Sequence, residues 1–171
     1  MAQTPGAMLE VDPATFALKG YSLHVRVPLN GSEEARRWTV GVGGYAMEFP
    51  SAMRGMAVKN AASSTEIEIE RGAAVFIDRY LDQPLQGWFT GLELGRQRYK
   101  LSDGAQVERY DATVAMPRLG YHFKLDGGWY VLPWVGVGFV DTDRDELNVG
   151  GRTVKPRSTL AFATVHVGYA F

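Results

Sequence analysis

Within the expected final strand, roughly 159–171, the residues from Ala163 to Phe171 alternate between two kinds of side chain, with a period of two. One face of the implied strand is apolar up to the last residue and consists of Val165, Val167, Tyr169 and Phe171. The opposite face carries small and polar side chains, namely Thr164, His166, Gly168 and Ala170. A period of two residues is that of a β-strand, and a wholly apolar face needs apolar material to pack on. This pattern predicts an ordered strand rather than a frayed terminus.

Six further stretches show the same alternation and are bounded by turn residues. They are 19–29, 37–49, 66–81, 87–100, 110–125 and 129–141. In 66–81 we expect Ile67 and Ile69 to share the apolar face with Val75. In 37–49 the apolar phase changes, and a bulge at Gly43-Gly44 is predicted to bring both phases onto one face.

A single-chain barrel needs an even number of strands, so an eighth is required. Two candidates remain: residues 52–59, and an N-terminal piece near 6–18 that Pro13 interrupts. The first is favoured. It leaves 1–18 as a tail or short helix, with Asp12 as its cap and Pro13 at its first position, and 19–171 as the barrel.

The second face of these strands combines small residues with charges of both signs. We predict that it forms an interior polar network of His24, Arg26, Glu66, Glu68, Glu70, Asp78, Glu93, Arg118, His122 and His166. An eight-stranded barrel is just wide enough for its side chains to fill, and buried charges need partners of opposite sign. The predicted fold is therefore all-β: a closed antiparallel transmembrane barrel with its apolar faces outward. In the alternative, a soluble eight-stranded barrel, the apolar faces would point inward.

The connections alternate in length. Residues 82–86 and 126–128 are tight turns, whereas 101–109 and 142–158 are predicted to be long polar loops. Short periplasmic turns and longer external loops are the habit of bacterial outer-membrane barrels. A periplasmic C-terminus satisfies all four connections.

The ending, residues 163–171, resembles the C-terminal strand of outer-membrane β-barrel proteins. Over 19–171 the chain resembles small barrels of the OmpA, OmpX and OmpW kind in architecture. The resemblance implies a Gram-negative outer membrane, contact with lipid and lipopolysaccharide, and help from the barrel-assembly machinery during folding. It also implies that Val165, Val167, Tyr169 and Phe171 form the assembly signal. Because residues 1–5 look like an initiator on a mature N-terminus, we expect that a signal peptide has been removed.

Composition excludes several functions. The chain has no cysteine, which rules out a disulfide framework and any thiolate metal site. Its formal net charge of -1 gives no broad attraction for nucleic acid. Asp141-Thr-Asp143-Arg-Asp145 begins like a calcium loop, but Glu146 and Arg152 occupy the positions that need Gly and Glu. We expect no metal and no cofactor.

The histidines raise the question of catalysis. Lipid A acylases and deacylases need a nucleophile, a histidine and an acidic group that orients it. His24 and His166 are expected to be neighbours inside the barrel, with Ser22 and Thr164 nearby. No nucleophile elbow is visible, so we predict no catalytic residues and interpret these side chains as interior polar packing.

Arg96 and Arg98 lie on the lipid-side phase of 87–100, beyond Leu94. Guanidinium groups bind phosphate well, so both are predicted to contact lipopolysaccharide at the outer headgroup level. The predicted role of the protein is non-enzymatic: structural, or binding a ligand not identified by the sequence through 101–109 and 142–158. A porin-like passive channel for small hydrophobic molecules, as the OmpW kind implies, and a lipid A-modifying enzyme are the alternatives.

Overall fold

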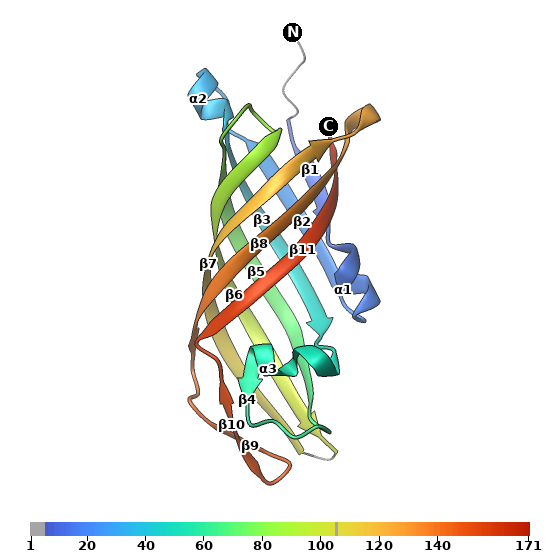
Figure 1. The fold of residues 1–171 in the computed structure, drawn as a ribbon, viewed down its shortest axis with the longest axis vertical. Helices are drawn as coiled ribbons and strands as arrows, with labels where there is room; N and C mark the ends of the chain where they lie inside the picture. Colours follow the sequence, from blue (N-terminus) through green and yellow to red (C-terminus); the bar gives the residue numbers. More distant parts are fainter. Residues whose placement is uncertain (1–5, 105) are drawn as a thin grey trace.

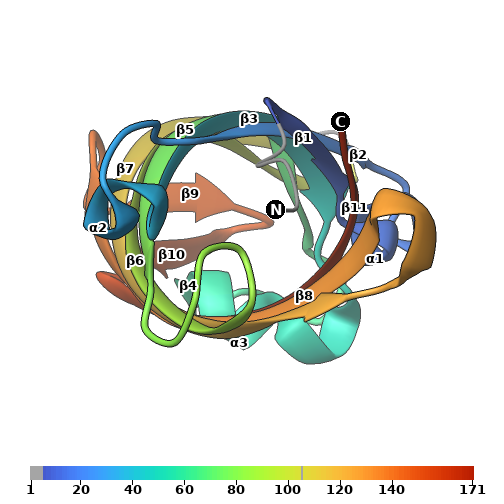
Figure 2. The same ribbon diagram turned by 90° about the horizontal axis from the view of Figure 1, so that it is seen from above.

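The computed structural model describes residues 6–104 and 106–171. Residues 1–5, on which the expectation of a removed signal peptide rests, lie outside this part. Eight strands form a closed antiparallel barrel in the order β1-β11-β8-β7-β6-β5-β3-β2, which confirms the predicted fold class (Figures 1 and 2). Their bounds are β1 Met8–Val11, β2 Tyr21–Pro28, β3 Trp38–Glu48, β5 Glu66–Tyr80, β6 Gly87–Asp103, β7 Gln106–Lys124, β8 Trp129–Thr142 and β11 Thr159–Ala170. Gly6, the first described residue, donates a hydrogen bond to the C-terminal residue Phe171, and both lie at one end of the barrel, called here the terminal end; the other is the distal end.

The eighth strand is β1, so the preference for 52–59 was wrong. β1 pairs with β11 on one side and with β2 on the other, and it closes the barrel with only four residues. Pro13 ends the strand but does not prevent it. Residues 52–59 instead form part of the 3-10 turn η1 (Ser51–Met53), helix α3 (Arg54–Ala57) and strand β4 (Val58–Lys59). The barrel therefore begins within the segment that was expected to be a tail.

The helices are short and connect strands. Helix α1 (Pro13–Ala17) follows β1, with Pro13 in its first turn and the Asp12 carboxylate accepting a hydrogen bond from the Ala14 N–H, as predicted. Helix α2 (Glu33–Arg36) and the 3-10 turn η2 (Asp126–Gly128) lie at the terminal end. Over the described residues, no helix has both the length and the apolar character needed to cross a bilayer.

The distal connections are more ordered than expected. Strands β6 and β7 continue through most of 101–109 and pair up to Asp103 and Gln106, so this stretch is a tight hairpin rather than a loop. Within 142–158 lie β9 (Leu147–Val149) and β10 (Arg152–Pro156), which form a small sheet with β4. This sheet lies at the distal end of the barrel (Figure 1).

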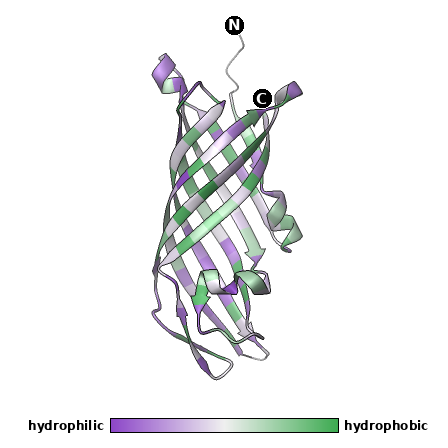
Figure 3. Ribbon diagram, in the orientation of Figure 1, coloured by the Kyte–Doolittle hydropathy of each residue, from purple (hydrophilic) through white to green (hydrophobic). Residues whose placement is uncertain are grey.

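An apolar belt surrounds the outside of the barrel toward its terminal end. Leu23, Val42, Val75, Leu94 and Val135 are each about half exposed. On the terminal side of these residues, aromatic rings gather on the outer face: Trp88 packs on Tyr121, and Trp129 packs on Tyr169. The alternating hydropathy of the strands is visible in Figure 3.

Toward the distal end the two faces exchange character. In β3, Val40 and Val42 point outward, whereas Met47 is buried inside, although the ladder with β2 runs without a bulge at Gly43-Gly44. The predicted bulge there was wrong. The apolar side chains change face because the polarity of the two faces is exchanged: on the distal side of the apolar belt the interior is apolar and the exterior is charged.

Strand β5 contains a bulge that the alternation of its sequence did not reveal. Register shifts on both sides of the strand place one extra residue, Glu70, between Ile69 and Arg71. A single extra residue moves all later side chains to the opposite face. Ile67 and Ile69 are therefore buried, while Val75 faces outward as predicted.

Two prolines weaken one seam of the wall. The ladder between β7 and β8 is interrupted between the pairs Ala115–Phe139 and Arg118–Gly136, where Pro117 lies. It is interrupted again between the pairs that flank Pro133, although both prolines keep their register with the strands on their other sides. Proline has no N–H to donate, so this seam has fewer hydrogen bonds than its neighbours.

Candidate functional site

A layer of polar side chains crosses the barrel interior, and every strand of the wall contributes to it. Its members, in chain order, are Glu10, Arg26, Thr39, Asp78, Glu93, Arg118, Tyr130 and His166. They are joined by hydrogen bonds into one network, called here the charged layer. Because it spans the barrel from wall to wall, it fills the lumen at this level.

Arg26 is the centre of one half of the charged layer. Its Nε donates to Glu10 Oε1 at 2.5 Å, and its Nη1 donates to Asp78 and to Thr39 Oγ1. Both Arg26 and the side chain of Glu10 are completely buried. Glu10 also accepts a hydrogen bond from Tyr130 and bonds to His166 Nδ1 at 2.9 Å.

Arg118 organises the other half. It binds Asp78 through two nitrogens, at 2.9 and 2.8 Å, and donates to Glu93 Oε2 at 3.0 Å. The Phe76 ring packs against both guanidinium groups, with its centroid 4.7 Å from Arg26 Cζ and 4.5 Å from Arg118 Cζ. Planar guanidinium groups suit both the paired carboxylate bonds and the ring contacts.

A glycine makes this layer possible. Gly91 is paired with Asp78 in the neighbouring strand, and a Cβ at this position would collide with the Asp78 carboxylate. The inner-face glycine thus leaves space for the central acid of the layer rather than for an open channel.

The predicted interior residues divide into two groups. His24, Arg26, Asp78, Glu93, Arg118, His122 and His166 do lie inside the barrel. His122 is apart from the charged layer and bonds to the Tyr80 hydroxyl at 2.9 Å.

The glutamates of β5 were wrongly placed in the interior. Glu66, Glu68 and Glu70 are on the outer face near the distal end, because the bulge at Glu70 reverses the face of this half of the strand. Glu68 pairs with Lys100 on the neighbouring strand β6, and Glu70 pairs across β6 with Arg109 on β7.

Sequence reasoning missed Glu10, the acid that joins three strands of the network. Its strand has only four residues, which is too few to show a period of two above chance. His24 and His166 are neighbours as predicted, with ring centroids 4.7 Å apart, but β1 lies between their strands. For Glu10, the signal available in the sequence was that an ionisable residue stands alone between the apolar residues Leu9 and Val11.

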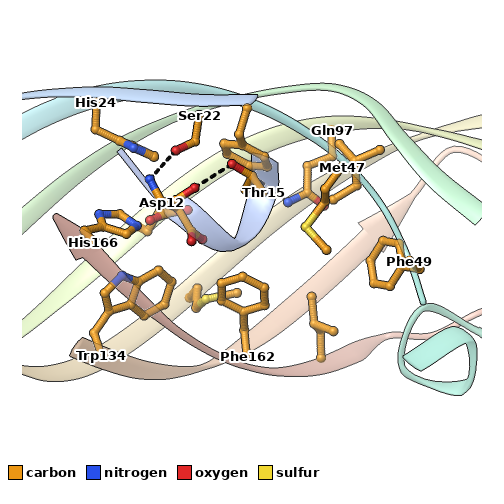
Figure 4. A pocket seen from close by; sticks show the side chains of 15 residues that line it. Asp12, Thr15, Ser22, His24, Met47, Phe49, Gln97, Trp134, Phe162 and His166 are labelled. Atoms are coloured by element: carbon orange, nitrogen blue, oxygen red, sulfur yellow. Dashed lines mark hydrogen bonds between the residues drawn. The ribbon is translucent and has the colours of Figure 1, made fainter. Parts of the chain in front are cut away.

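A cavity of about 50 Å³ adjoins the charged layer on its distal side. Its polar lining includes Asp12, Ser22, His24, Glu93, Gln97, Trp134 and His166, and its apolar lining includes Met47, Phe49, Ile69 and Phe162. In Figure 4, His24, His166 and Trp134 lie at one end of the cavity and Phe49 lies at the other. Beyond it, an apolar core around Ile69, Tyr99, Leu101, Leu147 and Val154 fills the distal end.

The chemistry of catalysis is not assembled around this cavity. The Ser22 hydroxyl accepts the Asp12 backbone N–H, and the Thr164 hydroxyl donates to the Asp12 carboxylate. Among the hydrogen bonds of the described residues, neither hydroxyl reaches a histidine. The same residues contain no cluster of three or more His, Cys, Asp or Glu arranged to hold a metal ion.

The predicted surface residues lie on the outer face. Arg98 binds Asp111 through two nitrogens at 2.7 and 2.9 Å, while the side chain of Arg96 is 77% exposed. On β11, Val165 and Phe171 are exposed, whereas His166 is buried, as the alternation predicted.

Comparisons with known proteins add little beyond the fold. No protein-family model matches the chain, and no curated protein matches it in sequence. One solved structure that it resembles is the crystal structure of Acinetobacter baumannii CarO2. The two chains are 12% identical, the match covers 100% of each, and the TM-score is 0.47.

Proposed function

We propose that this protein is a closed outer-membrane barrel of a Gram-negative envelope, without enzymatic activity, which supports the envelope and presents its distal end for binding. The observation that carries the proposal is an inversion: the outside is apolar where the inside holds the charged layer. In water the reverse arrangement is favoured, whereas lipid selects this one. The terminal end would face the periplasm and the distal end the exterior.

The membrane assignment has a direct test. A folded barrel of this type should migrate faster in unheated than in heated detergent gels. It should also fractionate with outer membranes, and it should need detergent to remain monodisperse. A chain that stays monodisperse without detergent and shows one gel mobility would contradict the assignment.

A closed lumen supports a structural or binding role over transport. The charged layer fills one level of the barrel, and the apolar core fills the distal end. At the terminal end, a vestibule of about 460 Å³ ends on Met8, Leu85, His122 and Tyr130. We expect no stepwise currents when the protein is incorporated into planar bilayers; discrete openings would favour the passive channel instead.

Lipopolysaccharide would bind at the distal rim, which is defined here as one register row on the distal side of the apolar belt. This row consists of Ala73, Arg96, Thr113 and Asp141. Both arginines pair with Asp111, Arg98 at 2.7 Å and Arg96 at 3.7 Å, but the Arg96 side chain is 77% exposed and is therefore the better placed to meet a lipid phosphate.

The binding test compares matched variants at the two ends. Arg96→Gln together with Arg98→Gln should lower the lipopolysaccharide that copurifies with the barrel, and Arg36→Gln at the terminal end should not. Equal retention in both variants would remove the rim from the proposal.

The lipid A-modifying alternative remains testable in the same cells. It would require the lipid A mass to change on expression and to revert on His24→Ala or His166→Ala. We expect an unchanged lipid A mass, because within the described part of the chain no hydroxyl beside the cavity is bonded to a histidine.

A further inference from the structure

The barrel wall is not built from strands all the way around. β1 pairs with β11 only from Val167 onward, so residues 159–166 of β11 have no strand beside them on that side. On the other side of this gap, β2 begins opposite Ala46, and β3 continues beyond it. Among the described residues, helix α1 occupies the place where a strand would be.

Helix α1 is held in this gap by bonds at its two ends. At one end Asp12 donates its N–H to Ser22 and accepts the Thr164 hydroxyl at 2.6 Å. At the other end the Leu18 carbonyl accepts the Glu48 N–H at 2.9 Å, and Lys19 pairs with the Glu48 carboxylate. Thr15 is buried and lines the cavity, whereas Phe16 on the outer side is 53% exposed. A five-residue helix is therefore the partition between the cavity and the surroundings of the barrel.

Two buried polar atoms that border the cavity lack a partner. His24 Nδ1 and Trp134 Nε1 form no hydrogen bond with any described residue, although His24 is 6% and Trp134 5% exposed. Buried polar groups in native proteins are almost always bonded, because an unmet donor or acceptor costs free energy. Both residues line the same cavity, on either side of the His166 ring (Figure 4).

The lining specifies the chemistry of that occupant. The indole N–H can only donate, and a neutral imidazole nitrogen without a proton accepts, so a hydroxyl group, which both donates and accepts, can bond to either atom. The carboxylate of Glu93, also in the lining, disfavours an anion. Met47, Phe49 and Ile69 provide an apolar surface for the rest of the molecule.

We propose that this cavity binds a small neutral molecule with a hydroxyl group and an apolar body, which enters from the lipid past α1. The cavity of about 50 Å³ is smaller than the ~150 Å³ that admits benzene in other proteins, so a six-membered ring requires α1 to move outward. This site is independent of the distal rim and of conduction through the lumen.

Phenol and benzene are matched probes for the hydroxyl. With the barrel in lipid nanodiscs, phenol should shift the indole N–H resonance of Trp134, which Trp134→Phe identifies by its loss. Benzene should bind about tenfold more weakly, since it offers neither hydrogen bond. No shift with phenol, or equal affinity for the two probes, would overturn the proposal.

Two histidine variants locate the effect. His24→Phe should weaken phenol binding about tenfold and bring it to the level of benzene. His122→Phe changes a buried histidine outside the cavity and should leave phenol binding unchanged. Heat-modifiable gel mobility checks that each variant is folded; a folded His24→Phe variant with unchanged affinity would contradict the assignment.

The entrance is tested with a reversible lock. The chain has no cysteine, so Leu18→Cys with Glu48→Cys introduces one defined pair at positions joined by a backbone hydrogen bond. The oxidised lock should slow phenol binding at least tenfold, and reduction should restore it. Equal rates in the two states would show that the ligand does not enter past α1.

Discussion

Two regions of the barrel interior are filled by different kinds of side chain: the charged layer by ion pairs, and the distal core by apolar residues. The charged layer joins eight strands through directional bonds, with Arg26 fully buried among carboxylates. The distal core, to which the β4-β10-β9 sheet contributes, is built from apolar side chains such as Leu101, Leu147 and Val154. The comparison teaches that buried charge follows the exterior: where the outer face is apolar the ion pairs lie inside, next to apolar residues such as Leu132, and where the outer face is charged the interior is an apolar core.

The two interiors should respond differently to substitution. A buried ion-pair network fails when one member is removed, because the remaining charges lose their partners. An apolar core loses transfer free energy in proportion to what is deleted, and its surroundings relax in part.

The largest effect is expected in the charged layer. Arg118→Met removes three hydrogen bonds to Asp78 and Glu93 and should destabilise the barrel by about 3–5 kcal/mol. Reversible urea unfolding in detergent measures this. Adding Glu93→Gln should recover part of the loss; a single variant within about 1 kcal/mol of the parent would break the comparison.

The distal core should give a smaller and more local effect. Leu147→Ala deletes a buried side chain of β9 and should cost about 2–4 kcal/mol, mainly by loosening the β9-β10 hairpin. Limited proteolysis within 142–158 should accelerate while the unheated gel mobility stays that of the folded barrel. Loss of the folded mobility would mean that the two regions unfold together.

The cap of α1 lies between the two regions and should matter less. Asp12→Ala removes the side-chain bonds to Ala14 and Thr164 and should cost about 1–2 kcal/mol. Amide exchange in residues 14–18 should increase. Ser32→Ala removes the equivalent cap of α2 and is the matched control, in which exchange near α1 should not change.

The smallest effect lies outside both interiors. A hydrogen bond from Arg79 holds the pKa of the Glu34 carboxyl, in α2, below its ordinary value. A lowered pKa contributes stability that is present above the unfolded-state pKa and is lost as pH falls through the folded-state pKa. The difference in melting temperature between the parent and Glu34→Gln should therefore shrink from about pH 6 to about pH 3. A difference that grows on acidification would contradict the sign.

Much of the wall followed from the sequence, because a period of two reports faces directly. The outward positions of Leu23, Leu94, Val135 and Val165 were predicted correctly. The positions of the β5 glutamates were predicted wrongly. The bulge at Glu70 moves the apolar side chains from the inner to the outer face, and the apolar environment moves from inside to outside the barrel at nearly the same level. The sequence therefore keeps one unbroken alternation and shows neither change.

The centre of the site was harder to predict than its rim. Arg26, Asp78 and Arg118 were assigned to the interior, but their partner Glu10 was not, because β1 is too short to carry a pattern. The cavity was not predicted either. It depends on α1 replacing a strand in the wall, which is a property of the three-dimensional register rather than of any local pattern.

Pro117 and Pro133 have a consequence for how the cylinder opens. Away from α1 and the short ladders of β1, the wall can open only if two long paired strands separate. Among the long strands, the ladder between β7 and β8 is interrupted at both prolines, so this boundary is expected to separate before the continuous β6–β7 ladder. The β5-β6-β7 ribbon would then stay intact as a single folding unit.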